Sequence, residues 1–206
     1  MFEQLDTVDW GLLTHAYGEA TDVPRLLRLL LSPDAKERER AIYNLFGNIW
    51  HQGTVYPATA AAVPFLYELL TAPDVPDKSD IALLLASIAD GVGYLEVHTV
   101  SDFGERTWRK ILGEKGKTLE GELERERGEI ASVRRAASVG LPHLIPYLRD
   151  RDPELRRLVA VALGNYSEHS AVTLPALDAA ETSELDEEVR EALGQSKERL
   201  TNRAAG

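Results

Sequence analysis

The chain has 206 residues, of which 44% are hydrophobic and 28% charged, and it contains no cysteine. This composition is typical of a folded globular protein, and it excludes disulfides, thiolate catalysis and cysteine-ligated zinc. The formal net charge of −11 disfavours binding to nucleic acid or to an anionic membrane surface.

The N-terminus carries acidic residues and lacks the basic region and apolar core of a secretory signal. The apolar stretches of the chain are too short to span a bilayer. We therefore expect a cytoplasmic protein that does not enter the membrane.

The hydrophobic spacing predicts helices along almost the whole chain. The first four expected helices span 5–18, 22–31, 35–50 and 59–71, and Gly18 ends the first of them. A fifth helix is expected at 79–90, followed by a loop at 91–104 and a short helix at 105–112. A long charged helix runs from Thr118 to about Ser138, and the last four helices are expected at 141–149, 153–166, 171–180 and 185–200.

The chain also contains an internal repeat. The segment Asp22–Asp34 and the helix after it resemble Gly140–Pro153 and the helix after that. Two weaker copies follow the same plan, so that prolines 24, 64, 142 and 175 mark the first helix of each copy. The gap of 78 residues in the middle is close to two repeats, and it predicts a degenerate copy between Gly91 and Val139.

Each copy reads as a pair of helices that cannot stand alone. Leu26, Leu27 and Leu30 form the apolar stripe of a first helix. Asp152 before Pro153 is a typical helix start, and Gly164 is a typical helix end. Because one pair would expose apolar surface on both flanks, neighbouring pairs must stack.

This pattern resembles the HEAT-repeat family. The likeness covers most of residues 20–90 and 130–200, and the residues that carry it are Pro142, Asp152, Leu155-Arg156 and Ala162-Leu163-Gly164, with Val189-Arg190 and Ala192-Leu193-Gly194 repeating the motif. The resemblance implies an all-α fold, a right-handed α-α superhelix of about four to five helix pairs. We expect a single domain over residues 1–206 with an irregular insertion at roughly 91–117.

Two segments depart from a simple repeat and are candidate binding sites. The first, Gly47–Thr59, gathers polar and aromatic side chains at one helix end, where a short polar turn would suffice; its candidate residues are Asn48, Trp50, His51, Gln52, Thr54 and Tyr56. The second is the insertion, with His98, Arg106 and Trp108. Both segments also have a purely structural interpretation, in which the aromatic residues fill gaps between repeats and the polar ones satisfy helix ends.

No catalytic constellation or cofactor motif is present. The sequence lacks the phosphate-binding loops and the GxSxG motif, and no histidine is spaced to share a metal with another. HEAT-repeat hydroxylases place His-Glu dyads on their helices, and none of the five histidines here is followed by glutamate. We therefore expect no catalytic residues, no metal site and no cofactor.

The leading hypothesis is a non-catalytic scaffold that binds another protein. It would be an adaptor, inhibitor or immunity-type protein of bacterial type, and its acidic balance favours a basic partner such as a toxin or nuclease. Trp50, Tyr56 and Trp108 are the candidate anchors. One alternative is an enzyme or small-ligand binder with a site near 48–59 and 96–109, for which His51 and His98 would have to converge. A second is nucleic-acid binding through the arginines 134, 135, 149, 151, 156 and 157.

Overall fold

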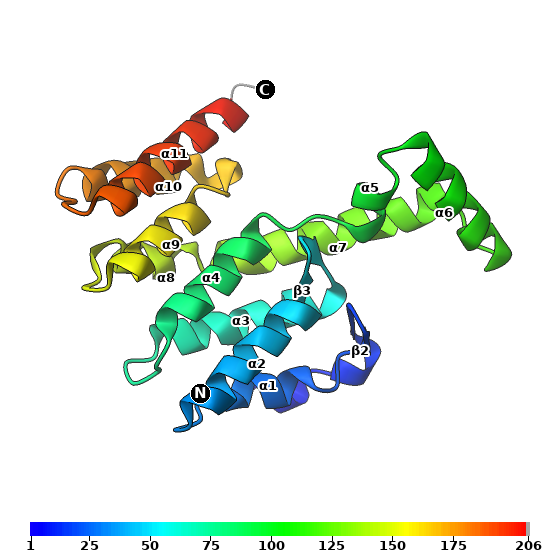
Figure 1. Cartoon of the computed structure of the whole chain (residues 1–206), viewed down its shortest axis with the longest axis horizontal. Coiled ribbons are helices and arrows are strands. Elements are labelled where there is room, and N and C mark those ends of the chain that lie inside the picture. Colours follow the sequence, from blue (N-terminus) through cyan, green and yellow to red (C-terminus); the bar gives the residue numbers. More distant parts are fainter. Residues whose placement is uncertain (205–206) are drawn as a thin grey trace.

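The computed structural model describes residues 1–204 and shows an all-helical solenoid (Figure 1). Four helix pairs follow one another along it. The first two pairs are α1 (Val23–Leu29) with α2 (Ala35–Asn48), and α3 (Pro57–Thr71) with α4 (Lys78–Ala89). In the third pair, α8 (Leu141–Leu144) and the 3₁₀ helix η3 (Ile145–Arg149), which follow the end of α7 (Leu119–Val139), pack against α9 (Pro153–Leu163). The fourth consists of α10 (Ser170–Glu181) and α11 (Glu187–Ala204), preceded by the 3₁₀ helix η4 (Ser167–His169).

The pairs stack side by side in two layers. First helices contact first helices, as α1 does α3 and α3 does α7, while α2, α4, α9 and α11 form the second layer in sequence. One continuous apolar core runs between the layers through all four pairs. The predicted all-α solenoid is therefore confirmed, and the number of pairs lies at the lower end of the expected four to five.

The predicted degenerate copy between Gly91 and Val139 is wrong. Helix α4 packs directly on α9, so no helix pair lies between the second and third pairs. The segment is instead an insertion that contains α5 (Tyr94–His98), α6 (Asp102–Glu114) and the first half of α7. It is longer than the predicted 91–117, and the expected loop at 91–104 contains α5 and the beginning of α6.

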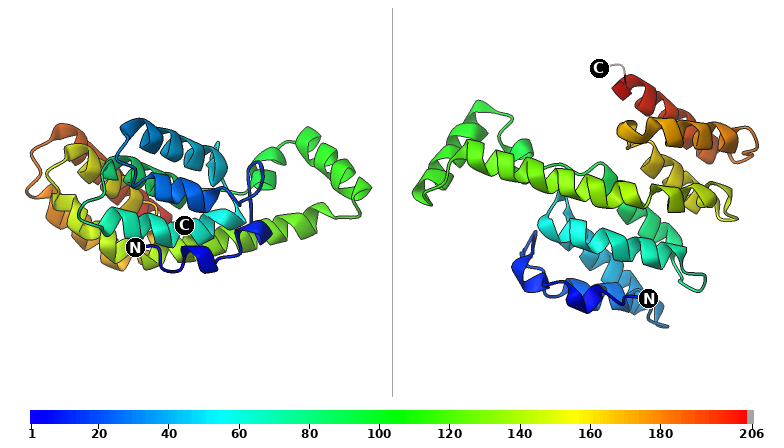
Figure 2. Two further views of the ribbon diagram at one scale, coloured as in Figure 1. Left: turned by 90° about the horizontal axis from the view of Figure 1, so that it is seen from below. Right: turned by 180° about the vertical axis from the view of Figure 1, so that it is seen from behind.

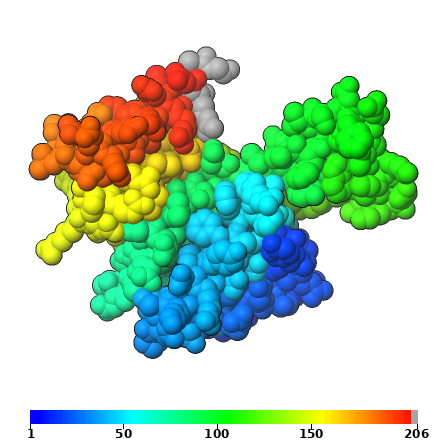
Figure 3. All heavy atoms as spheres, in the orientation of Figure 1, coloured from blue at the N-terminus to red at the C-terminus, as the bar shows by residue number. Residues whose placement is uncertain are grey.

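We call residues 94–127 the arm, because they project beyond the stacked pairs (Figure 2). In the space-filling view the arm forms a separate lobe (Figure 3). The arm has a small apolar core of its own, built from Leu95, Leu112 and Leu119 with Trp108 and Leu123 against it. The arm is thus attached to the solenoid mainly through α7, which continues from one into the other.

The helix predicted at 5–18 is also wrong. This segment forms two short 3₁₀ helices, η1 (Leu5–Thr7) and η2 (Trp10–Leu12), followed by a hairpin of strands β1 (Thr14–His15) and β2 (Gly18–Glu19). Trp10 is buried against Phe65 and donates its indole N–H to the Leu5 carbonyl at 2.9 Å. Leu5, Trp10 and His15 are all buried, and residues spaced by five do not share one face of an α-helix, while Leu12 is left 81% exposed.

The glycines that end the second helices have different roles. At Gly164, the end of α9 approaches α11 so closely that an added Cβ would lie 2.6 Å from the Ser196 Cβ and 2.8 Å from its Cα. Nothing lies within 4 Å of a Cβ added to Gly47, at the matching position of α2. The same position of the repeat motif therefore holds Gly164, which the close packing requires, and Gly47, which the packing does not require.

We predict that Gly164→Ala lowers the free energy of unfolding by about 1–3 kcal/mol, because Ser196 belongs to a packed helix and cannot move away cheaply. The matched control Gly47→Ala should leave stability unchanged or raise it by up to about 1 kcal/mol, because alanine is the better helix former. Urea denaturation of both variants measures the difference. Equal effects would show that α9 and α11 are not in the close contact described.

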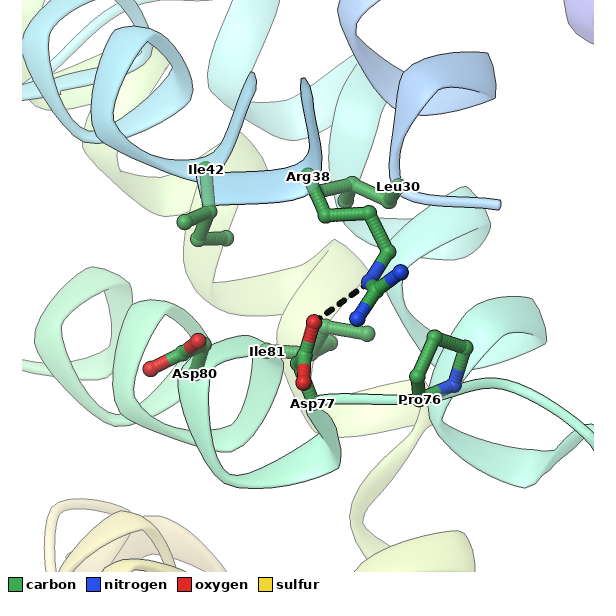
Figure 4. A pocket seen from close by; sticks show the side chains of 7 residues that line it. All are labelled: Leu30, Arg38, Ile42, Pro76, Asp77, Asp80 and Ile81. Carbon is green, nitrogen blue, oxygen red and sulfur yellow. Dashed lines mark hydrogen bonds and ion pairs between the residues drawn. The ribbon is translucent and has the colours of Figure 1, made fainter. Parts of the chain in front are cut away.

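Neighbouring pairs are also joined through their turns. Arg38, in the first turn of α2, donates to the Ser32 carbonyl and pairs with Asp77 in the next helix pair at 2.5 Å (Figure 4). Arg156, at the matching position of α9, donates to the Asp150 carbonyl and pairs with Glu184 at 2.7 Å. The same arginine position therefore ties one turn to the next at both ends of the solenoid.

Glu184 should make stability depend on pH. Its hydrogen bonds from the Arg156 guanidinium lower the pKa of this carboxyl to about 2. A carboxyl with a lower pKa in the folded state stabilises the fold above its unfolded pKa of about 4.3, and this contribution disappears as the pH falls to about 2.

We predict that Glu184→Gln destabilises the protein by about 1–3 kcal/mol at pH 7, and that its difference from the wild type shrinks steadily between about pH 5 and 2. The control Glu154→Gln breaks an exposed pair with Arg157 and should cost at most about 0.5 kcal/mol. Thermal unfolding across this pH range tests both. A difference that stays constant down to pH 2 would contradict the assignment.

Candidate functional site

The segment Gly47–Thr59 contains a β-hairpin between α2 and α3. Strands β3 (Trp50–His51) and β4 (Thr54–Val55) pair through a two-residue turn, in which Gln52 and Gly53 have φ values of 50° and 91°. Two positive φ values are typical of a type I′ turn. The Val55 amide donates to the Val92 carbonyl at 3.1 Å, and this bond connects the hairpin to the chain that enters the arm.

The N-terminal hairpin lies against the same end of the solenoid. Buried His15 hydrogen-bonds through Nε2 to Asp22 at 3.0 Å, and its Nδ1 accepts from the Tyr17 amide at 3.1 Å. Asn48 donates to the other Asp22 oxygen at 2.6 Å. Because these groups are satisfied by one another, Asn48 joins the hairpin to α2 and does not face a free surface site.

A cleft of about 270 Å³ opens where the two hairpins meet the arm. We call it the arm cleft. Both hairpins, α5, α6 and α7 contribute to its lining, which consists of Thr14, Val55, Tyr56, Pro57, Tyr94, Leu95, Trp108, Leu112, Lys115, Lys117, Glu122, Arg125, Glu126 and Glu129. Three aromatic side chains from separate segments, 56, 94 and 108, therefore surround a single hollow.

Tyr56 forms the solenoid side of the arm cleft. It is the residue before the first turn of α3, and its backbone amide donates to the Thr59 hydroxyl at 2.8 Å. Its phenol lies 2.6 Å from the Thr54 hydroxyl, which itself donates to the His51 carbonyl. The Tyr56 phenol is thus the donor to Thr54, and burial raises the pKa of Tyr56.

Tyr94 and Trp108 form the arm side. Their ring centroids are 5.5 Å apart and the ring planes meet at 89°, so that the two side chains make a corner. His98 stacks on Tyr94 with centroids 4.0 Å apart, and its Nδ1 contacts the Tyr94 carbonyl oxygen at 2.8 Å. His98 covers one face of Tyr94 and does not line the cleft.

Glu126 of α7 is a buried carboxylate in the lining. It accepts the Leu95 amide at 2.9 Å and the Glu96 amide at 3.4 Å, so that it holds the first turn of α5 against α7. Burial raises the pKa of Glu126, and the two backbone donors oppose this rise. Gly93 permits the approach, since a Cβ there would lie 2.5 Å from the Glu126 carboxylate.

Trp50 lies on a different surface. Its ring packs edge-to-face on Phe46 at 5.9 Å, and its indole N–H is buried without a hydrogen-bond partner among residues 1–204. It lines a groove of about 390 Å³ that crosses the second helices of three pairs, together with Leu83, Arg157 and Arg199. We call this the second-helix groove.

The structure therefore brings together only some of the predicted site residues. Tyr56 and Trp108 both line the arm cleft, and the Thr54 hydroxyl is hydrogen-bonded to the Tyr56 phenol. His51 lies beside Tyr17, with ring centroids 5.4 Å apart, and Gln52 and Arg106 are exposed outside the cleft lining. His51 and His98 thus contact separate tyrosines, and neither lines the cleft as the ligand-binding alternative expected.

Sequence reasoning missed three residues of this end of the molecule. Tyr94 and Glu126 line the cleft, and His15 fixes the first hairpin through Asp22. The paired runs of β-formers around Gln52-Gly53 were a usable signal for the second hairpin. For Glu126 the usable signal was its spacing of seven residues from both Leu119 and Val133, which places it on the buried face of α7.

Three of the six arginines in the cluster proposed for nucleic acid are paired with carboxylates. Arg134 contacts Glu168 at 2.8 Å and also donates to the Asn165 carbonyl. Arg156 and Arg157 pair with Glu184 and Glu154. Half of the six side chains thus already have acidic partners.

Other kinds of site are not formed by the described part of the chain. Among residues 1–204, no group of three histidine, aspartate or glutamate side chains is arranged to hold a metal ion. Within the same residues, no helix has both the length and the apolar character needed to cross a membrane.

Neither a protein-family model nor a curated protein matches this chain. Among solved structures, it is similar to two engineered proteins from the Northeast Structural Genomics Consortium, at 22% and 21% identity, with TM-scores of 0.37 and 0.33. The matches cover 87% and 88% of this chain and 79% and 48% of those chains. A designed armadillo repeat protein is 16% identical over 86% of this chain and 99% of its own, with a TM-score of 0.26. At these scores the likenesses say nothing about function.

We predict that Gly93→Ala loosens α5 from α7 and leaves the solenoid intact, because the new Cβ would displace the Glu126 carboxylate from the Leu95 amide. Amide exchange of residues 95 and 96 should accelerate at least tenfold, while exchange in α9 stays unchanged. Gly113→Ala is the control, since a Cβ there meets nothing within 4 Å. Unchanged exchange at residue 95 would contradict the role given to Glu126.

Proposed function

We propose that this protein is a non-catalytic scaffold that binds another protein, and that the arm holds the partner. The observation that carries the proposal is an apolar surface on the arm. Val97, Val100 and Phe103 are 48%, 85% and 75% exposed, and Tyr94 beside them is 39% exposed. We call these four residues the arm patch.

The arm patch is unusual in its position. Solvent-exposed apolar residues are common when scattered singly, but a cluster on a projecting element is typical of an interaction site. The four residues are spaced by three along α5, the following turn and the start of α6. Tyr94 belongs to both the patch and the arm cleft, so it links the two.

Charge supports a basic partner. Residues 1–90 carry 13 acidic and six basic side chains, whereas residues 91–139 carry nine of each. A basic protein would be drawn to the acidic solenoid and could contact the uncharged patch without like-charge repulsion. We also propose that the pairs are HEAT repeats, on the motif residues of the third and fourth pairs and the shared role of Arg38 and Arg156.

We predict that purified protein captures a stoichiometric partner from lysate of its own source, and that Val100→Ser with Phe103→Ser reduces recovery at least tenfold. Removing exposed anchors from an interface centre costs about 2 kcal/mol or more. Leu185→Ser is the matched control, since Leu185 is 90% exposed at the other end of the solenoid. The captured protein, once purified, should bind less tightly as salt is raised.

The separate position of Trp50 makes the test sharper. Under the proposal, Trp50→Ala alters the second-helix groove and leaves partner recovery unchanged. Loss of the partner with Trp50→Ala, but not with the arm-patch variant, would overturn the assignment of the arm. No partner under any condition that preserves the fold would overturn the proposed function.

A further inference from the structure

The arm cleft contains a buried carboxylate that forms no direct ion pair, although Arg125 of the same lining lowers its pKa through its charge. Glu126 has only backbone donors, Leu95 and Glu96, and it makes no ion pair with the side chains of residues 1–202. Glu126 as a whole is only 8% exposed. A buried carboxylate normally has a cation or several hydrogen bonds near it, because removing an ionised group from water is costly.

The cations that line the cleft are mostly committed to other acids. Arg125 pairs with both Glu122 and Glu129, and Lys117 pairs with Glu122 at 3.1 Å. Lys115 is exposed at the end of α6. Two of the three glutamates on this wall are therefore paired, and Glu126 is the one left without an ion pair.

We propose that the arm cleft receives an arginine or lysine side chain of the protein partner, with its cationic group beside Glu126 and its methylenes against Tyr56, Tyr94 and Trp108. This inference rests on the proposed function, because it names the chemistry by which the partner is recognised. The partner residue would supply the ion pair that Glu126 lacks.

Three observations support a cation over other occupants. Aromatic rings attract cations through their faces, and Trp108 and Tyr94 form a corner in the lining. At about 270 Å³ the cleft is smaller than pockets for drug-sized ligands and suits a single long side chain. Burial raises the pKa of Glu126, and an adjacent cation would favour its charged form.

The test uses small probes and the full chain, so that it does not depend on the partner. Nα-acetyl-arginine amide, Nα-acetyl-norleucine amide and Nα-acetyl-glutamate amide are titrated at pH 7 and constant ionic strength. Nuclear magnetic resonance follows the Trp108 indole and the Leu95 amide, which donates to Glu126. We expect saturable shifts with the arginine probe and a dissociation constant at least tenfold below that of norleucine.

Two variants locate the charge. Glu126→Gln should weaken arginine binding at least fivefold, and Glu124→Gln should not change it, since Glu124 is 78% exposed on the same helix. The spectrum of Glu126→Gln without any probe shows whether this substitution disturbs the arm. If it does, Trp108→Leu serves as the test variant and should weaken arginine binding at least threefold. Equal binding of arginine and norleucine, preference for the glutamate probe, or unchanged affinity in the cleft variants overturns the proposal.

The two proposals fail separately. Capture of a partner that depends on the arm patch, together with no arginine preference in the cleft, would preserve the scaffold function and remove the cation site. Arginine binding at Glu126 without capture of any protein partner would preserve the cation site and remove the scaffold function.

Discussion

Helix α7 belongs to two cores at once, and the rest of the structure depends on this constraint. Its last turns bury Val133 and Ala137 in the solenoid, while Leu119 at its start is buried in the arm. Glu126 stands between them and holds α5. Because one rigid helix carries both cores, the arm has a defined position relative to the hairpins, and the arm cleft exists only through that position.

Much of the fold could be predicted because the spacing of apolar residues indicates the helix pairs. Leu26, Leu27 and Leu30 mark α1, and Asp152, Pro153 and Gly164 mark the limits of α9. The long helix from Thr118 was also predicted. The Thr118 side chain caps this helix by accepting a hydrogen bond from the Gly121 amide. These signals are local, so one sequence suffices to read them.

The errors came where local spacing carries no information. The two hairpins have strands of two residues each, too short for an alternating pattern. The gap between prolines 64 and 142 matched two repeats in length, but length alone cannot distinguish a helix pair from an arm. Only the contact of α4 with α9 settles that point.

The candidate site was predicted in part for a related reason. Tyr56 and Trp108 are unusual residues for a repeat and could be singled out, although their meeting depends on how the arm folds back. Trp50 looked equally unusual and lies in the second-helix groove. Glu126 lies seven residues from both Leu119 and Val133, so its spacing along α7 indicates burial, while its contact with α5 depends on tertiary structure.

The direct packing of α4 on α9 means that the arm, residues 94–127, is a closed loop inserted in the solenoid. The entropy of closing such a loop grows only with the logarithm of its length, and doubling the loop costs about 0.6 kcal/mol. The stability of the stacked helix pairs therefore depends only weakly on the length of the arm. In related chains the arm should be the part that gains or loses residues, while the distance from each second helix to the next is preserved.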